Sequence, residues 1–277
     1  MVVSKSYRIH NLIEFKINLK KRLFWKRFLK TFQQFETYLP LTQFYKFDCL
    51  KPKLLDFLKL QTSEITPFIF YLMLGKASCM LHATGLWKNG KGYIISGDSG
   101  AGKTTATFHA MARDYKLLGD NWIILKDHCI FSMFYPLNIF YYNQEYINNE
   151  LSLWDKTFLL ATRIFYHLTG KKYFTSKRPE ELFNGRMMDS CKCDKVFHLV
   201  KGDKFKVQKV KMGEMTKLLV DNCDREIALP SVDNIFHFWY DFRDLLAKNL
   251  KGKEMYKVTI PKDFNDEVFE QLEEYMK

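Results

Sequence analysis

The feature of the sequence that most constrains the fold is a glycine-rich stretch between an apolar run and a helix-like segment. The stretch reads Gly97-Asp98-Ser99-Gly100-Ala101-Gly102-Lys103-Thr104 and fits the pattern G-x-x-x-x-G-K-[ST]. The apolar run covers residues 92–96, and residues 105–113 have the composition of a helix. We therefore predict a loop that joins the end of a strand to the N-terminus of a helix.

This placement suits a phosphate-binding loop. Glycines let backbone N–H groups approach phosphate oxygens, and the helix N-terminus adds a partial positive charge. In such a loop Lys103 reaches the β- and γ-phosphates of a nucleotide, and the Thr104 hydroxyl ligates Mg²⁺. We predict that a nucleotide and Mg²⁺ bind here, and that residues 97–104 together with Thr105 form the nucleotide site. A chance match in a glycine-rich turn is the alternative.

The composition places the chain among globular proteins. Of its 277 residues, 47% are hydrophobic and 27% are charged, which excludes a disordered chain and is enough for one or two domains. The six cysteines follow no disulfide pattern, and Cys191 and Cys193 lack the second ligand pair of a zinc site. We find no apolar run long enough to span a bilayer and no signal peptide. The predicted location is therefore the cytoplasm, with reduced thiols.

Charge and composition divide the chain into two predicted regions. Residues 1–60 form a basic N-terminal region of unknown role, and residues 61–277 form the domain that contains the predicted nucleotide-binding loop. The net charge is +12, and residues 1–30 carry nine basic side chains against one acidic side chain, Glu14. Residues 19–35 have the spacing of a basic amphipathic helix. Such a surface can meet nucleic acid, anionic lipid or an acidic protein, but a solvated face is the interpretation that we favour.

The remaining patterns predict an α/β domain with a mixed sheet. Residues 7–17 alternate like one or two strands, and residues 78–87 have the pattern of a strand. Three hairpins are predicted, with turns at Asn89-Gly90, Asp127-His128 and Gly202-Asp203. Helices are expected over residues 66–74, 103–114, 145–168, 214–223, 232–250 and 265–276, a basic loop over 171–186 and a last strand over 256–260. Because hairpins are antiparallel, the sheet differs from the purely parallel sheet of a βαβ nucleotide-binding fold.

Two residues outside the loop stand at defined distances from it. Asp120 follows Thr104 by 16 residues within Leu117-Leu118-Gly119-Asp120-Asn121, and His82 precedes Gly97 by 15 residues. Together with the loop G-D-S-G-A-G-K-T, these segments resemble the core of the HPr kinase/phosphorylase family and its kinase-like relatives. The resemblance covers about residues 78–126. It implies a fold similar to that of HPr kinase and phosphoenolpyruvate carboxykinase, with the P-loop on a mixed sheet.

The resemblance also implies an activity, the transfer of the ATP γ-phosphoryl group to a hydroxyl of a small molecule or of a protein serine. Asp120 matches the family's catalytic base, and His82 matches an active-site histidine. The chemistry of the residues agrees, because a carboxylate near the γ-phosphate can deprotonate an attacking hydroxyl while Lys103 offsets the charge of the transferring group. Thr104 and Asn121 are the predicted metal ligands. Asn121 replaces the family's second aspartate, which weakens the expected metal site.

Other interpretations stay open at the level of the sequence. His82 can be a satisfied core histidine, and Asp120 can be a turn residue. The protein can be a P-loop ATPase, or a nucleotide-sensing module whose catalysis is weakened by Asn121. We expect a nucleotide and a hydroxyl-bearing substrate as partners, and no nucleic acid, because we find no RNA-binding aromatic motif or helix-turn-helix signature. The resemblance leaves a homo-oligomer open.

Overall fold

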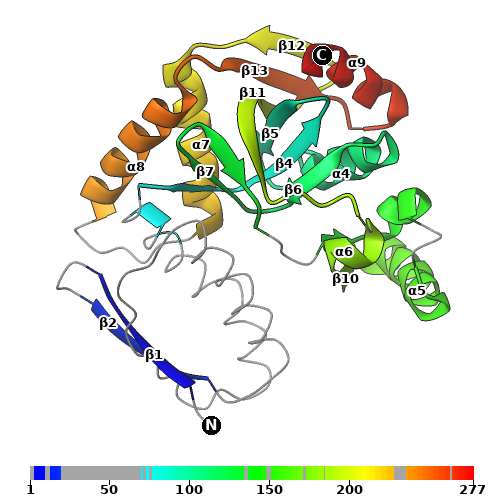
Figure 1. The fold of residues 1–277 in the computed structure, drawn as a ribbon. Coiled ribbons are helices and arrows are strands. Elements are labelled where there is room, and N and C mark those ends of the chain that lie inside the picture. The colour runs from blue at the N-terminus through cyan, green and yellow to red at the C-terminus, as the bar shows by residue number, and fades with distance from the viewer. Residues whose placement is uncertain are drawn as a thin grey trace. The chain divides into compact units, whose positions relative to one another are not determined.

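The computed structural model divides the chain into two units, residues 1–77 with 227–230 and residues 78–226 with 231–277. The structure describes residues 3–9, 13–19, 70, 73–74, 77–133, 137–147, 151–170, 173–183, 185–227, 235–262 and 264–277. Figure 1 labels their helices and strands. The domain boundary predicted between residues 60 and 61 lies outside the described residues, as does the helix predicted over residues 19–35 apart from its first residue.

The first unit contains a two-stranded antiparallel hairpin. β1 (Val3–Ile9) pairs with β2 (Ile13–Leu19), with Val3 in register with Leu19. This hairpin confirms the strands expected from the alternation in residues 7–17. It also places Leu19 at the end of a strand and not at the start of the predicted helix.

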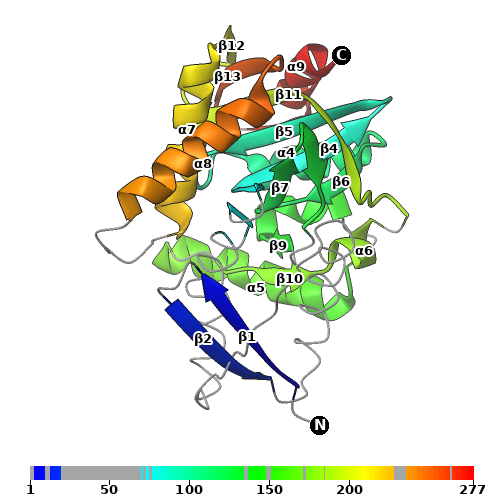
Figure 2. The ribbon, with the colours of Figure 1, turned by 60° about the vertical axis from the view of Figure 1, so that its left-hand side comes forward.

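A nine-stranded mixed sheet forms the frame of the second unit (Figure 1, Figure 2). Its strands are β3 (Cys79–Leu81), β4 (Ala83–Lys88), β5 (Lys91–Gly97), β6 (Lys116–Gly119), β7 (Ile123–Lys126), β8 (Cys129–Phe131), β11 (Ser190–Lys201), β12 (Lys206–Lys209) and β13 (Glu254–Ile260). They are hydrogen-bonded in the order β3-β7-β8-β11-β5-β4-β6, and β13 pairs with both β11 and β12. β11 runs parallel to β5 and β13, whereas β4 pairs antiparallel with β5 and β6. The mixed sheet predicted from the sequence is therefore confirmed.

Two of the three predicted hairpins are confirmed. Asn89 and Gly90, with φ of 52° and 84°, connect the antiparallel strands β4 and β5. Asp127 and His128, with φ of 49° and 62°, connect β7 and β8 in the same way. Positive φ at both central residues is what a type I′ turn requires, and its twist matches that of the paired strands.

The third predicted hairpin is wrong. β11 and β12 are neighbours in the sequence, but β13 lies between them in the sheet and pairs parallel with β11 and antiparallel with β12. A Cβ atom on Gly202 would lie 2.3 Å from Cγ2 of Thr259 in β13. Gly202 therefore allows β13 to pack closely against it and does not form a hairpin turn. A local sequence pattern cannot reveal this contact, because β13 lies about fifty residues later in the chain.

The helices of the second unit are α4 (Lys103–Ala112), the 3₁₀ helix η1 (Tyr141–Ile147), α5 (Leu153–Thr169), α6 (Pro179–Leu182), α7 (Met212–Ile227), α8 (Ile235–Leu250) and α9 (Asp266–Met276). Of these, α4, α8 and α9 begin and end within three residues of the predicted limits. α7 continues four residues beyond its predicted end, α6 was not predicted, and the helix expected over residues 145–168 differs most. α5 begins late because Ser152 and Asp155 form a capping box at its N-terminus. Asn265 caps α9, as predicted, by accepting a hydrogen bond from the Val268 N–H.

The basic loop expected over residues 171–186 contains regular structure. β10 (Thr175–Lys177) pairs antiparallel with β9 (Leu137–Ile139) in a small second sheet, and α6 follows. β10 forms by pairing with β9, which lies more than thirty residues earlier in the chain. The composition of the segment alone could not indicate this pairing.

Helices cover both faces of the main sheet around β5. Figure 1 shows α7 and α8 on one side and α4 on the other. On the α4 side, Ile95 of β5, Phe108 of α4 and Phe269 of α9 belong to one hydrophobic core and are at most 1% exposed. On the other side, Asn222 of α7 donates a hydrogen bond to Ser96 Oγ at 3.0 Å. The end of β5, where the glycine-rich loop begins, is therefore held from both sides.

Candidate functional site

The glycine-rich loop leaves β5 at Gly97 and enters α4 at Lys103, as the sequence predicts. Gly102 precedes the helix with a φ of 96°, and a Cβ atom there would lie 2.5 Å from the Phe264 ring. At Gly97 the φ is 153°, and a Cβ atom would lie 2.5 Å from the backbone oxygen of Leu199. Both positions therefore require glycine, because a side chain would strain the backbone and collide with a neighbour.

Lys103 is buried, with 7% of its surface exposed, and its ammonium group points back into the loop. Its Nζ donates to the backbone oxygens of Gly97 at 2.6 Å and Asp98 at 3.2 Å. Burial lowers the pKa of Lys103, while the negative charges of Asp120 and Glu226 act in the opposite direction. An ammonium group has three donors, so this desolvated cation retains the capacity to bind an anion at the loop.

Asp120 follows β6 and is only 1% exposed. Its Oδ2 accepts a hydrogen bond from Thr104 Oγ1 at 3.0 Å, and its Oδ1 accepts from Thr107 Oγ1 at 3.1 Å and from the Thr84 hydroxyl. The structure therefore brings together Asp120 and Thr104, two of the predicted site residues. It adds Thr84 and Thr107, which the sequence analysis missed.

Local geometry explains both missed threonines. Thr107 stands three residues after Thr104 on α4, so the two hydroxyls share one face of the helix. This spacing is a signal that the sequence contained. Thr84 comes from β4, whose Gly85 pairs with Gly119 immediately before Asp120. No pattern in the sequence could show this contact, because it depends on the pairing of β4 with β6.

His82 lies at the break between β3 and β4, so the single strand predicted over residues 78–87 is wrong at this point. Its Nδ1 is 3.4 Å from Asn222 Oδ1 and 3.7 Å from Glu226 Oε1, both on α7. Burial, with a further contribution from the charge of Lys103, lowers the pKa of His82 to about 3. His82 is therefore a neutral, hydrogen-bonded imidazole near the loop at neutral pH.

Asn121 has a φ of 71°, in the left-handed region that asparagine tolerates better than most residues. Its backbone oxygen accepts a hydrogen bond from the Ala83 N–H at 3.2 Å. Backbone conformation is thus a sufficient reason for an amide residue at this position. The role of Asn121 as a metal ligand stays a prediction.

Basic side chains that the sequence analysis missed lie beside the loop. Arg225 of α7 forms an ion pair with Asp98, with Nη2 and Oδ1 2.5 Å apart. Lys201, at the end of β11, places its Nζ 3.2 Å from where a Cβ atom on Gly100 would be. Both residues are more than ninety positions from the loop in the sequence, so nothing in the local pattern pointed to them.

Three basic residues of the segment predicted as a basic loop, residues 171–186, have partners outside the glycine-rich loop. Lys177 forms an ion pair with Asp155 at 2.6 Å, and Arg178 forms one with Glu181 at 3.2 Å. Arg186 donates to the backbone oxygen of Met111. These contacts give the three cations structural roles away from the loop.

His198 of β11 is a further buried histidine, beside the end of β5. It pairs in register with Ser96 of β5 and is 1% exposed. Its Nδ1 has no hydrogen-bond partner within the part of the chain that the structure describes. Burial lowers the pKa of His198 to about 4, so this ring is also neutral at neutral pH.

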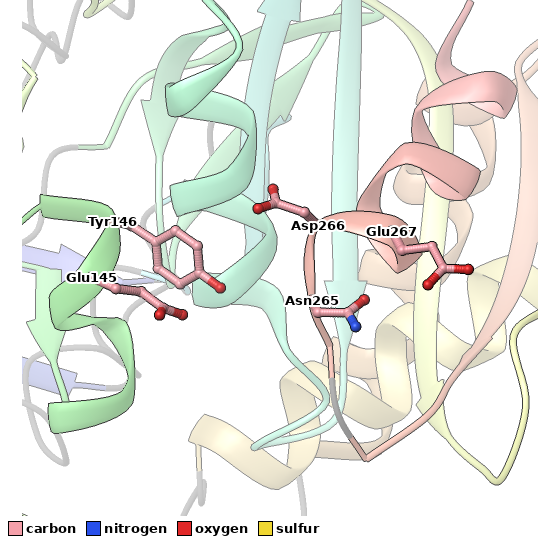
Figure 3. A pocket seen from close by; sticks show the side chains of 5 residues that line it. All are labelled: Glu145, Tyr146, Asn265, Asp266 and Glu267. Atoms are coloured by element: carbon pink, nitrogen blue, oxygen red, sulfur yellow. The ribbon is translucent and has the colours of Figure 1, made fainter.

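A cavity of about 420 Å³ lies between η1 and the N-terminus of α9 (Figure 3). Figure 3 shows Glu145 and Tyr146 of η1 across from Asn265 and Asp266, with Glu267 beside them. Three carboxylates line this cavity, so it repels phosphate and is not the predicted nucleotide phosphate site. Within the described ranges, no group of three His, Cys, Asp or Glu side chains could hold a metal ion.

The fold and the loop define a mixed α/β protein in which a glycine-rich loop joins a central strand to a helix. The sequence matches no protein-family model. It also matches no curated protein. Among solved structures, the HPr(Ser) kinase/phosphatase from Coxiella burnetii is a distant structural match, with a TM-score of 0.36 and 13% sequence identity over 71% of this chain and 95% of that chain. In the described part of the chain, no helix has the length and apolarity needed to cross a membrane.

Proposed function

We propose that the chain binds ATP at the loop over residues 97–104 and transfers the γ-phosphoryl group to a hydroxyl acceptor, as a kinase of the HPr kinase-like type. The observation that carries this proposal is the contact between Asp120 and Thr104 at the first turn of α4, with Oδ2 and Oγ1 3.0 Å apart. Lys103 lies one residue before Thr104 and is buried in the loop. The proposal is thus supported by a carboxylate–hydroxyl pair and by a buried ammonium group in the loop where the sequence motif predicts a nucleotide phosphate.

The electrostatics of the loop favour an anion. Lys103 is desolvated, and its hydrogen bonds within the described residues go to two backbone carbonyl oxygens, so a phosphate offers it a stronger, charge-assisted partner. The N-terminus of α4 adds its partial positive charge and free backbone N–H groups. Arg225 and Lys201 add cationic charge at the rim of the loop.

The residues around Thr104 also fit Mg²⁺. Thr104 donates its hydroxyl hydrogen to Asp120, which leaves the lone pairs of its oxygen for a cation. Mg²⁺ is usually held by one or two protein oxygens together with phosphate oxygens, so a large protein cluster is not needed. When bound, the ion would neutralise charge on the phosphates. Asp120 then orients the Thr104 hydroxyl, and Asn121 is a further predicted ligand.

Asp120 is also the predicted base. As a buried carboxylate beside the loop, it can accept the proton of an acceptor hydroxyl that replaces one of its present threonine partners. Lys103 would offset the negative charge that develops on the transferring group. The neutral ring of His82 cannot donate a proton as an imidazolium at neutral pH, so we assign it a positioning role through Asn222 and Glu226.

One observation favours a second candidate function. Asp120 is 1% exposed and both of its oxygens already accept hydrogen bonds from threonines. A carboxylate enclosed in this way has little access to a bulky acceptor. A nucleotide-sensing module or an ATPase, in which Asp120 serves only Thr104 and Mg²⁺, is the alternative.

Transfer of labelled γ-phosphate tests the proposal. Wild-type protein is incubated with labelled ATP, Mg²⁺ and a panel of hydroxyl acceptors, while nucleotide affinity is measured separately by calorimetry. We expect transfer by the wild type and loss of ATP binding in Lys103→Ala. Lys217→Ala, an exposed lysine on α7, is the matched control and should bind normally.

The outcomes separate the candidates. Normal ATP binding by Lys103→Ala would contradict the nucleotide site itself. Release of inorganic phosphate without an acceptor would favour the ATPase, and binding without any turnover would favour the sensor.

A further inference from the structure

Helix α5 presents an apolar face that the second unit does not cover. Most of the helix is exposed, and its packed side consists mainly of Asp155, Leu159 and Thr162. Seven large apolar side chains of the helix are exposed, and six of them have exposed fractions from 44% to 82%. These six are Leu153, Trp154, Leu160, Ile164, Phe165 and Leu168. Clusters of this kind on a globular protein mark interaction sites.

Helical periodicity places these six residues on one side of the helix, which we call the α5 apolar face. Leu153, Leu160, Ile164 and Leu168 are separated by intervals of seven and four residues, so they form one row along the helix. Trp154 and Phe165 belong to an adjacent row. Figure 1 shows α5 beyond the main sheet, beside α6 and β10. A helix of 17 residues is about 25 Å long, so the face is long enough to lie flat on a surface.

Exposed aromatic residues extend the α5 apolar face at its C-terminal end. The ring of Tyr173 contacts that of Phe165, with centroids 5.4 Å apart, and Phe174 contacts Phe140 at 5.5 Å. Tyr173 and Phe174 are 43% and 46% exposed. Aromatic side chains that combine apolar rings with partial exposure are enriched where proteins meet the polar edge of a bilayer.

The exposed charge on α5 itself has one sign. Lys156 and Arg163 lie seven residues apart and therefore on the same side of α5. Asp155, the single acidic residue of the helix, is buried and paired with Lys177 at 2.6 Å, so it does not offset them at the surface. Two more lysines, Lys171 and Lys172, follow α5 in the sequence.

We propose that the α5 apolar face docks on the surface of an anionic phospholipid membrane, with α5 lying in the plane of the interface. An exposed apolar helix face with cationic side chains along its edge is the combination that binds such surfaces. A second copy of the chain fits less well, because α5 offers no exposed carboxylate to meet the Lys156 and Arg163 of its partner. Docking of this kind needs no helix that crosses the bilayer.

Sedimentation of the full-length protein with vesicles tests this proposal. The probes are vesicles of phosphatidylcholine alone and of phosphatidylcholine mixed with phosphatidylserine. We expect the protein to pellet with the mixed vesicles, to pellet less with phosphatidylcholine, and to be released by salt because exposed charges are screened. Fluorescence of Trp154 should shift to shorter wavelength on binding, and Trp154→Phe should remove that change.

Substitutions identify the surface that binds. Trp154→Ser with Leu168→Ser should reduce vesicle binding at least tenfold, and Arg163→Glu should reduce it about fivefold on anionic vesicles alone. Both apolar residues are at least 78% exposed, so the variants should fold, which thermal unfolding verifies. Tyr240→Ser, which removes an aromatic side chain 63% exposed on α8, is the matched control.

Three results would overturn the proposal. In the first, the protein fails to pellet with either kind of vesicle. In the second, it pellets equally well after Trp154→Ser with Leu168→Ser, which would assign vesicle binding to basic residues elsewhere in the chain. In the third, the wild type forms a dimer in analytical ultracentrifugation that these substitutions dissociate, without vesicle binding. The last result would make a second copy of the chain the occupant of the α5 apolar face.

Discussion

Replacing Asp120 by asparagine and by alanine separates its structural role from its chemical role. In Asp120→Ala, the hydroxyls of Thr84, Thr104 and Thr107 lose their carboxylate acceptor. Thr84 keeps Thr107 Oγ1 at 3.2 Å and Thr107 keeps the Lys103 backbone oxygen at 3.1 Å, so the main loss falls on Thr104. A buried polar group left without a partner costs about 1–3 kcal/mol, so we expect a loss of about 1–3 kcal/mol in the free energy of unfolding. Asp120→Asn keeps the shape and one acceptor oxygen, and should lose about 1 kcal/mol.

The chemical role is tested in the same pair of variants. An asparagine cannot accept a proton and brings no negative charge, so γ-phosphoryl transfer should fall about a hundredfold or more in both variants. Chemical denaturation measures the stability, and labelled ATP measures the transfer. Asp203→Asn, at an exposed position between β11 and β12, is the matched control and should change neither quantity.

Three results would refute parts of this reasoning. If Asp120→Asn is as unstable as Asp120→Ala, the negative charge and not the hydrogen-bond acceptor stabilises the site. If Asp120→Asn transfers phosphate at the wild-type rate, Asp120 is neither the base nor part of the metal site. If excess Mg²⁺ restores the rate of Asp120→Asn, Asp120 acts through the metal and is not the base.

Two further predictions concern the loop and the buried histidines. Gly102→Ala should weaken ATP binding and lower the melting temperature, because the φ of Gly102 is 96° and the new methyl group would collide with the Phe264 ring. Gly213→Ala is the control and should change neither quantity, because a Cβ atom at Gly213 has open space around it. Normal ATP binding by Gly102→Ala would contradict this expectation. His82 and His198 have folded-state pKa values lowered to about 3 and about 4, so the unfolded chain binds more protons and stability is lost as the pH falls below about 6.5. Each histidine should contribute about 2 kcal/mol of this loss between pH 6.5 and 5. His198→Phe should therefore reduce the dependence of the free energy of unfolding on pH, as measured by denaturant unfolding at a series of pH values. An unchanged pH dependence would show that the pKa of His198 is not lowered in the folded protein.

Local features of the fold could be predicted because they follow from neighbouring residues. Asn89-Gly90 and Asp127-His128 form the expected turns since their backbone conformations depend on the turn residues themselves. Asn265 caps α9 through a side chain that bonds three residues ahead. The same reasoning failed at Gly202, where the determining contact is with Thr259 of a distant strand.

The sequence by itself determined the glycine-rich loop, its position between β5 and α4, and the mixed character of the sheet. Each of these depends on periodicity, turn chemistry or the conformational freedom of glycine, all of which act over a few residues. Only the tertiary structure decided what surrounds the loop. Thr84 reaches Asp120 through the pairing of β4 with β6, and Asn222 reaches His82 because α7 packs on the sheet. Such contacts join residues 36 and 140 positions apart, and no local physical rule connects them.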